Sequence, residues 1–345
     1  MLDIKQTQNS LLKGELINET NCTVEAYLTD WITSVSGRLA PNTVSGYKTN
    51  INKHIIPAIG QKRLSALLNR DVQKMVDDMV KEGLSPRSVE YVVFTLGAAL
   101  RDAIKNRMLD YNAAERVVLP QKQEYVPPAL LNVEQAKTLL QAAINSPIEL
   151  EIILAVTCGT RRGETLGVSI SDVDFSAKRI FLHQQVTVNN LKDTGERVVI
   201  KDTLKTKKST RVIYPPDLVF NSVKRRLALI QHNKAALGSE YHDNGLLCCM
   251  PNGDPLQPER LTRSFHALLK ENGLPQIRFH DLRHSCATIL VEKCCSIDDV
   301  ANLLGHTSTK TTKHYSLQAE KPHVAANVFN DVIASDSQLA KIVPG

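Results

Sequence analysis

The sequence lacks the features of a membrane or secreted protein. None of its apolar stretches approaches the roughly 18 uninterrupted residues that cross a bilayer, and the opening MLDIKQTQNS holds no apolar signal core. Aromatic residues are scarce, at 5% with a single tryptophan, but hydrophobic residues make up 42% of the 345. This composition excludes a disordered or collagen-like chain. We expect a cytoplasmic protein of two domains, because a domain typically has about 150 residues.

Cysteine pairing and metal motifs are also missing. The seven cysteines include no C-x-x-C pair, and two couples are direct neighbours, Cys248 with Cys249 and Cys294 with Cys295. Such an odd set predicts reduced, buried thiols rather than a disulfide framework or a zinc site. The chain has no G-x-x-x-x-G-K-[ST] phosphate loop and no carboxylate cluster of the two-metal nuclease type. We therefore expect no cofactor and no metal.

Positive charge is present but concentrated in one segment. The chain has 42 Lys and Arg against 36 Asp and Glu, a net charge of only +6. Residues 192–234 alone hold eleven basic and four acidic residues, a local net charge of +7. This segment is either a solvated basic face or a patch that meets phosphate groups, and both interpretations stay open.

The first part of the chain predicts a small helical domain, residues 23–116, after a short arm, residues 1–22. Apolar residues recur at helical spacing in VEAYLTDWITSV, and similar patterns follow as far as about Asn106. Four residues are expected to begin, cap or end these helices: Pro41 (start), Asn69 (cap), Gly83 (end) and Ser85 (cap).

The second part predicts a domain over residues 129–333, between a proline-bearing linker, 117–128, and a tail, 334–345. Asn132 is expected to cap its first helix, and the β-branched runs RIFLHQQVTV, VVIKD and RVIYPP predict a small antiparallel sheet. Helical patterns resume after the sheet. The predicted fold class is mainly α with a small antiparallel sheet in the second domain.

Four segments of the second domain hold residues suited to phosphate chemistry: CGTRRGE, LKTKKSTR, FHDLRHS and LLGHTSTKTTKHYS. Each segment alone is weak evidence of function. With all four in this order, the chain resembles the tyrosine recombinase (integrase) family over roughly residues 23–333. Cys158 departs from the family pattern, in which Thr is commoner. The positions that match the catalytic residues of the family are Arg161, Glu164, Lys205, His280, Arg283, His306 and Tyr315.

The resemblance implies site-specific DNA recombination through a 3′-phosphotyrosyl intermediate and a Holliday junction. A phosphodiester under attack passes through a phosphorane with concentrated negative charge, which suits two arginines that each donate paired hydrogen bonds. We assign that role to Arg161 and Arg283. Tyr315 is the expected nucleophile, which needs a proton acceptor because a tyrosine pKa is near 10.

The remaining roles concern proton transfer and positioning. Lys205 on the expected hairpin suits the general acid that protonates the leaving 5′-oxygen, and Lys207 is the alternative that sequence alone does not separate from it. By family analogy His280 takes the tyrosine proton and His306 binds the phosphate. Glu164 is expected to hold Arg161 or a histidine in place. A capping box at Ser296 and a helix end at Gly305 predict that His306 is presented from a loop.

The resemblance also implies double-stranded DNA recombination sites as partners, bound by a homotetramer at the nucleoid. The candidate DNA contacts are Thr43, Lys48, Lys53, Arg87, Lys207, Lys208 and Arg211. An excisionase or a DNA-bending accessory protein is a further candidate partner. The 1–22 arm is too short for a typical independent arm-binding domain, which counts against binding at distal arm sites.

Two choices stay open on sequence. An apolar stripe at helical spacing, from Val324 to Ile333, packs either on its own domain or on a neighbouring protomer. The enzyme is expected to be the integrase of a phage or other mobile element. The alternatives are an Xer-type resolvase of chromosome or plasmid dimers, a monomeric type IB topoisomerase, and a non-catalytic DNA-binding relative.

Overall fold

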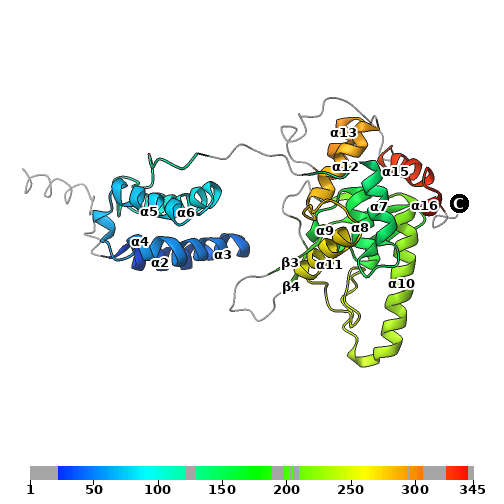
Figure 1. Cartoon of the computed structure of the whole chain (residues 1–345). Helices are drawn as coiled ribbons and strands as arrows, with labels where there is room; N and C mark the ends of the chain where they lie inside the picture. Colours follow the sequence, from blue (N-terminus) through cyan, green and yellow to red (C-terminus); the bar gives the residue numbers. More distant parts are fainter. Residues whose placement is uncertain are drawn as a thin grey trace, which may run out of the picture. The chain divides into compact units, whose positions relative to one another are not determined.

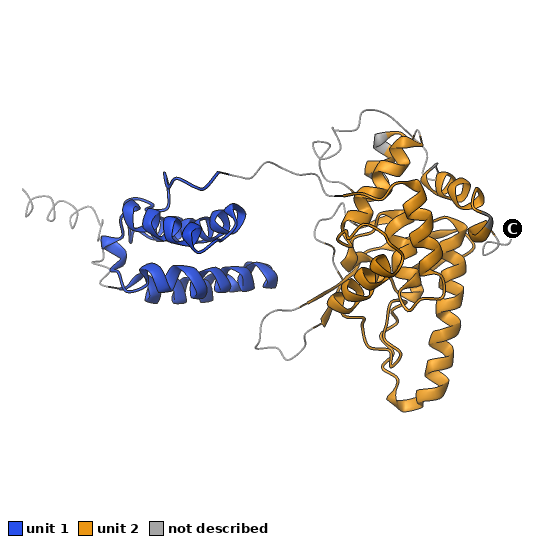
Figure 2. Cartoon of the chain, viewed as in Figure 1, with its two compact units in different colours: residues 1–126, 189–195 blue, residues 127–188, 196–345 orange. Residues whose placement is uncertain are grey.

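The computed structural model describes residues 22–121, 129–188, 198–202, 204, 210–293, 295–305 and 324–340. The chain divides into two compact units, one ending at Val126 and the other beginning at Pro127 (Figure 2). None of the described helices combines the length and the apolar character that a membrane-spanning helix needs.

The first unit is built of helices around one apolar core (Figure 1). Its elements are α2 (Val24–Ser36), α3 (Pro41–Asn50), the π-helical turn η1 (Ile51–Ile55), α4 (Ile56–Ile59), the 3-10 turn η2 (Leu64–Ala66), α5 (Asn69–Lys81) and α6 (Pro86–Lys105). The hydroxyl oxygens of Thr23 and Ser85 accept backbone N–H bonds from Ala26 and Ser88, which satisfies free donors at the starts of α2 and α6. The predicted helices are confirmed.

One predicted cap in this unit is wrong. Asn69 was expected to cap α5, but the capping position is Leu68, whose N–H donates to the carboxylate of Asp71 at 3.1 Å. The Asn69 side chain instead donates to the carbonyls of Ala113 and Glu115, at 3.2 and 2.7 Å. The helix therefore begins one residue early, because Asn69 is used to hold a distant turn.

The second unit surrounds the buried helix α8, all ten residues of which are buried. Helices α7, α10, α12 and α15 pack against it. The helices of this unit are α7 (Val133–Ala143), α8 (Glu149–Cys158), α9 (Arg162–Gly167), α10 (Asp217–Leu237), α11 (Pro258–Glu271), α12 (Asp281–Glu292), α13 (Ile297–Leu304), α15 (Val324–Ala334) and α16 (Ser337–Ala340), with 3-10 turns η3 (Ile170–Asp172) and η6 (Gly238–Glu240).

The strands of this unit form two small antiparallel sheets where the sequence predicted one. They are β1 (Val173–Asp174), β2 (Arg179–Leu182), β3 (Gln185–Val188), β4 (Val198–Lys201) and β5 (Arg211–Ile213). One sheet has the order β1-β2-β5 and the other pairs β3 with β4. The run RIFLHQQVTV is split because its middle docks on α9: a Cβ on Gly167 would lie 2.7 Å from the Gln184 carbonyl oxygen.

Two further expectations meet the structure in this unit. Asn132 caps α7 and exchanges hydrogen bonds with Gln135, as predicted. The stripe on α15 is buried within its own unit, with Phe329 fully inaccessible and Ala325 and Ile333 in the same core. Packing on its own domain is therefore the alternative that the structure favours. None of the described cysteines forms a disulfide, and Cys158, Cys248, Cys286 and Cys295 are buried.

Candidate active site

A glycine turn at the end of α8 places Arg161 at the start of α9. Gly159 has a φ of +59°, which favours glycine, and a Cβ there would lie 2.3 Å from the side chain of Leu304 on α13. The turn therefore brings α13 against the point where the two helices join. Arg161 caps α9, and its side chain remains 35% exposed.

The carboxylate of Glu164 is the buried centre of the site, 3% exposed. It accepts a hydrogen bond from the Arg161 backbone N–H at 3.1 Å, one from Arg161 Nη1, and one from Arg211 Nη2 at 3.1 Å. Burial acts to raise the pKa of Glu164, but the charges of Arg211 and Arg161 and the bonds from Arg161 hold it below its ordinary value. Glu164 is therefore ionised at neutral pH. Of the two partners predicted for Glu164, Arg161 or a histidine, the hydrogen bonds described here join it to Arg161.

Arg283, on the first turn of α12, is 3% exposed. Its Nη1 donates to the carbonyl of Gly159 at 2.7 Å, and its Nη2 donates to the carbonyl of Leu304 at 2.5 Å. A guanidinium has five N–H groups, so these two bonds leave donors for a further acceptor. Desolvation and the neighbouring charge of Arg161 lower the pKa of Arg283 to about 9, and it stays protonated at pH 7.

Two histidines lie at the start of α12. The rings of His280 and His284 are 5.3 Å apart and nearly perpendicular, at 85°. Desolvation and the positive charges of His284, Arg283 and Arg161 lower the pKa of His280. The imidazole is therefore neutral at pH 7 and able to accept a proton.

The site carries an excess of positive charge. Arg161, Arg211 and Arg283 surround the carboxylate of Glu164, which leaves a net charge of +2 among these four side chains. Buried charges are normally paired, because an unpaired one costs solvation energy. Such an excess suits a site whose missing counter-charge is a bound anion, as at a phosphodiester.

The site thus brings together four of the residues predicted from sequence. Five others lie outside the described residues: Lys205, Lys207, Lys208, His306 and Tyr315. Residues next to these five in the sequence lie at this site or close to the two sheets. Leu304 accepts the bond from Arg283. Gly305, the predicted helix end, has a φ of +64°, and His306 follows directly.

Comparison with known proteins decides the family. Residues 129–321 match the phage integrase family, and residues 23–80 match the N-terminal SAM-like domain of phage integrases. The chain belongs to the phage integrase family. It is an integrase-type tyrosine site-specific recombinase, so the predicted family, activity and fold class are confirmed.

Its relatives in this family include integrases and Xer recombinases. An integrase of Saccharopolyspora erythraea is 25% identical, over 90% of this chain and 80% of that protein. A XerC-like tyrosine recombinase of Caldanaerobacter subterraneus subsp. tengcongensis is 24% identical, over 72% of this chain and 67% of that protein.

Solved integrases share the fold. The Tn1549 transposon integrase in complex with a circular intermediate DNA has a TM-score of 0.70 at 19% identity, over 89% of this chain and 99% of that chain. The lambda integrase tetramer bound to a Holliday junction has a TM-score of 0.60 at 21% identity, over 90% of this chain and 83% of that chain.

The structure of this recombinase changes the interpretation of Arg211. The residue was predicted to contact DNA, but its side chain is only 8% exposed. Its Nε donates to the carbonyl of Leu303 at 2.7 Å while Nη2 reaches Glu164. Arg211 therefore faces the interior of the site. Its nearness to Lys207 and Lys208 in sequence suggested a surface position that the β2–β5 pairing does not give it.

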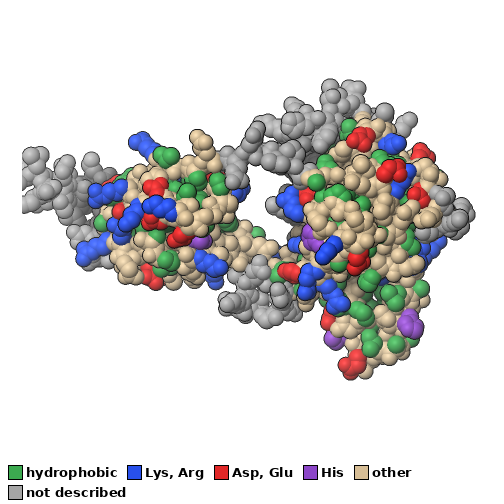
Figure 3. Space-filling view, in the orientation of Figure 1, with side chains coloured by type: hydrophobic (Ala, Val, Ile, Leu, Met, Phe, Trp, Pro, Cys, Tyr) green, Lys and Arg blue, Asp and Glu red, His purple; other side chains and the backbone are tan. Residues whose placement is uncertain are grey.

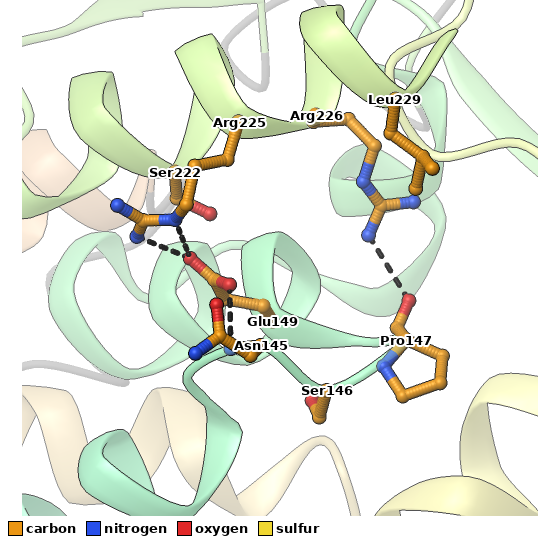
Figure 4. Close-up of a pocket in the computed structure, with 8 residues that line it drawn as sticks. All are labelled: Asn145, Ser146, Pro147, Glu149, Ser222, Arg225, Arg226 and Leu229. Carbon is orange, nitrogen blue, oxygen red and sulfur yellow. Dashed lines mark hydrogen bonds and ion pairs between the residues drawn. The ribbon is translucent and has the colours of Figure 1, made fainter. Parts of the chain in front are cut away.

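Further basic residues of the 192–234 segment are also neutralised within the protein. Arg225 on α10 donates to Glu149 on α8, and Arg226 donates to Glu151 at 3.0 Å and to the carbonyl of Pro147 at 3.0 Å. These arginines line a cavity of about 210 Å³, and Figure 4 shows their guanidinium groups turned toward α8 and its preceding loop. Neither interpretation of the 192–234 segment, a solvated basic face or a phosphate-binding patch, describes Arg225 and Arg226, whose charges are paired with Glu149 and Glu151.

The predicted DNA contacts of the first unit lie on three elements. Thr43 and Lys48 are on α3 and half-buried, while Lys53 is exposed on the π-helical turn η1 that follows α3. Arg87, at the start of α6, is exposed and pairs with Glu90 at 2.7 Å. Lys and Arg side chains are prominent on the visible surface of this unit (Figure 3).

Sequence reasoning missed an aromatic and basic stripe on the exposed side of α6. Tyr91 and Phe94 are 38% and 54% exposed, and Arg101, also exposed, lies over the Phe94 ring at 5.9 Å. With Arg87 and Lys105 these residues recur near multiples of 3.6, which places them on one helix face. Two exposed aromatics at this spacing were the signal that could have revealed it.

Proposed function

We propose that this recombinase cleaves DNA by attack of the Tyr315 hydroxyl oxygen on the scissile phosphorus. The bond from phosphorus to the 5′-oxygen breaks, which leaves a 3′-phosphotyrosyl link and a free 5′-hydroxyl. Attack by the 5′-hydroxyl of a partner strand on this link releases Tyr315 and rejoins the DNA. Two rounds of exchange pass through a Holliday junction. The phosphotyrosyl bond retains the energy of the phosphodiester, so rejoining needs no further energy source.

The arginine cluster carries this proposal. We assign the two non-bridging oxygens of the phosphate to Arg161 and Arg283, because both have N–H donors beyond those already used and both belong to the positively charged cluster around Glu164. Negative charge grows on these oxygens as the phosphorane forms. The guanidinium groups are held in advance by hydrogen bonds, so they need little rearrangement when it does.

Proton transfer is assigned to residues on both sides of the phosphate. His280 takes the proton of the Tyr315 hydroxyl, and the neutral ring that its lowered pKa favours supports this role. Lys205 gives a proton to the leaving 5′-oxygen, with Lys207 as the alternative, and His306 donates a hydrogen bond to the phosphate. On rejoining, each proton returns along the same path.

The assembly and domain boundaries are proposed on the same basis. A helical core-binding domain (23–116) and a catalytic domain (129–333), joined by a linker (117–128), grip double-stranded DNA at the nucleoid, with Thr43, Lys48, Lys53 and Arg87 among the contacts. Four copies act on paired sites, as in the lambda integrase tetramer on a Holliday junction. The basic and aromatic side of α6 supports contact with DNA.

We propose a mobile element as the source of the substrate sites, because the relatives described above include an integrase and the integrase of the transposon Tn1549. The XerC-like relative favours a second candidate, resolution of chromosome or plasmid dimers. Incubation with the joined ends of the element and with a chromosomal dimer-resolution site separates the two. Recombination of only the resolution site would select the second candidate.

Covalent trapping tests the chemistry directly. On a recombination site nicked beside the scissile phosphate, a short fragment carrying the 5′-hydroxyl diffuses away after cleavage and the phosphotyrosyl complex accumulates. We expect a covalent protein–DNA band with the unaltered protein and none with Tyr315→Phe, which keeps the ring but lacks the nucleophile. A Tyr315→Phe protein that still forms the band would place the nucleophile elsewhere.

A further inference from the structure

Arg211 on β5 joins two parts of the site that are far apart in the sequence. Its Nη2 donates to Oε2 of Glu164 at 3.1 Å, while Nε of the same guanidinium donates to the carbonyl oxygen of Leu303 at 2.7 Å. Leu303 is 92 residues away, in the last turn of α13. The buried guanidinium of Arg211 therefore links the carboxylate of Glu164, which also binds Arg161, to the C-terminal end of α13.

The end of α13 is held by two arginines of the same cluster. The last carbonyls of an α-helix have no partner within the helix and are satisfied by other groups. Arg211 takes the carbonyl of Leu303, and Arg283 takes the carbonyl of Leu304 at 2.5 Å. Movement of this helix end would therefore alter both arginines that contact it.

Arg211 also shares its carboxylate with Arg161. Glu164 Oε1 accepts from Arg161 and Oε2 accepts from Arg211, so the position of the carboxylate depends on both. Loss of Arg211 would remove one of the two bonds described for Oε2 and leave the one from the Arg161 backbone N–H. The carboxylate could then shift, and the Arg161 guanidinium bound to Oε1 would shift with it. A displacement of about 1 Å at a reacting group can reduce a rate by about 100-fold.

We propose that Arg211 is a positioning residue for DNA cleavage: it sets the geometry of Arg161 through Glu164, and it fixes the end of α13 from which the chain continues to His306. The residue does not touch the DNA. This inference rests on the proposed function, because it takes Arg161 as a ligand of the scissile phosphate.

Substitution by lysine separates geometry from charge. Arg211→Lys keeps the positive charge but replaces the two-pronged donor by a single ammonium group, which cannot match both acceptors in the same plane. We expect the rate of covalent complex formation, measured in a single turnover with saturating nicked site, to fall by about 100-fold. The dissociation constant for the site and its dependence on salt should equal those of the unaltered protein.

Arg179→Lys is the matched control. Arg179 lies on β2 of the same sheet, is 51% exposed and pairs with Asp174, so it undergoes the same chemical change away from the site. Its cleavage rate should stay at the unaltered value. Arg211→Gln is made in parallel, and thermal unfolding of all variants measures how much protein is folded.

A double substitution tests the path through Glu164. If Arg211 acts through this carboxylate, the rate loss of Arg211→Lys combined with Glu164→Gln should be smaller than the product of the two single losses, and the difference measures their coupling. Fully multiplicative losses would mean that the two residues act independently, which contradicts the proposed path.

Each remaining outcome decides the question. If Arg211→Lys cleaves at the unaltered rate while Arg211→Gln binds more weakly and lowers the salt slope by about 1, Arg211 is a phosphate contact and the proposal is wrong. If neither Arg211 variant folds, the residue is structural and the proposal is again wrong. If the unaltered protein forms no covalent complex on its own site, the proposed function fails before Arg211 is tested.

Discussion

Two clusters of arginines around buried glutamates lie at opposite ends of α8, and their charge balance differs. At the N-terminal end, Glu149 and Glu151 face Arg225 and Arg226, so two carboxylates meet two guanidinium groups. Beyond the C-terminal end, the carboxylate of Glu164 is surrounded by three guanidinium groups, those of Arg161, Arg211 and Arg283. The first cluster is neutral and the second is positive.

The pKa values of two arginines report this difference. Burial acts to lower the pKa of both, but at Arg226 Glu151 and the other groups around the guanidinium together outweigh burial and raise the pKa. At Arg283 burial and the charge of Arg161 act in the same direction and lower it. The balanced cluster therefore stabilises the packing of α10 on α8. The positive cluster retains an unfavourable charge interaction that an anionic phosphate would relieve, which is the expected property of a binding site.

Breaking the balanced cluster should have the largest effect on stability. Arg226→Gln leaves the fully buried carboxylate of Glu151 without its charged partner, so we expect a loss of about 3–5 kcal/mol in the free energy of unfolding. Urea denaturation, followed through the unfolding transition of the second unit, measures this loss. Cleavage per folded molecule should be unchanged, because this cluster belongs to no part of the proposed site.

The double substitution Arg226→Met with Glu151→Leu is the control for that loss. Removal of both charges leaves no buried ion, so stability should recover most of the deficit or exceed that of the unaltered protein. If the single substitution costs no stability, the pair is not the structural contact that its burial indicates.

Breaking the positive cluster should impair the reaction and spare the fold. Arg161→Gln removes a donor aimed at the phosphate, and loss of one such donor costs about 100- to 1000-fold in rate. Single-turnover trapping on a nicked site measures this rate. The free energy of unfolding should change little, because removal of one of three positive charges also relieves repulsion around Arg283. A variant that unfolds easily but cleaves normally would reverse the roles of the two clusters.

The contrast between these clusters shows what sequence could and could not predict. Arg161, Glu164, His280 and Arg283 lie in short motifs, so their types and order indicated the site before their distances were known. Helix starts at Ser85 and Asn132 followed from local capping. These features depend on residues within a few positions of each other.

Arg211 and Arg226 were beyond the reach of the same reasoning. Both lie in the basic 192–234 segment, yet their partners are 92 and 75 residues away for Leu303 and Glu151. Whether an arginine faces water or a buried carboxylate depends on strand pairing and helix packing, which the local pattern does not encode. The split of RIFLHQQVTV between two sheets has the same cause, a tertiary contact with α9.

The smallest expected effect comes from the edge of the positive cluster. The positive charge of His284 is one cause of the lowered pKa of His280, after desolvation. His284→Asn removes that charge, so the pKa of His280 should rise toward its ordinary value. His280 accepts a proton only when neutral, and a higher pKa means that protonation removes the base at a higher pH. The acid limb of the pH profile for covalent complex formation should therefore move slightly to higher pH, with the rate at pH 8 unchanged.

His242→Asn, which alters an exposed histidine paired with Asp254, should leave the profile in place. A shift to lower pH in the His284 variant would mean that His280 is not the base. The loss of a nearby positive charge can only raise the pKa of His280, so it cannot keep the ring neutral at a lower pH.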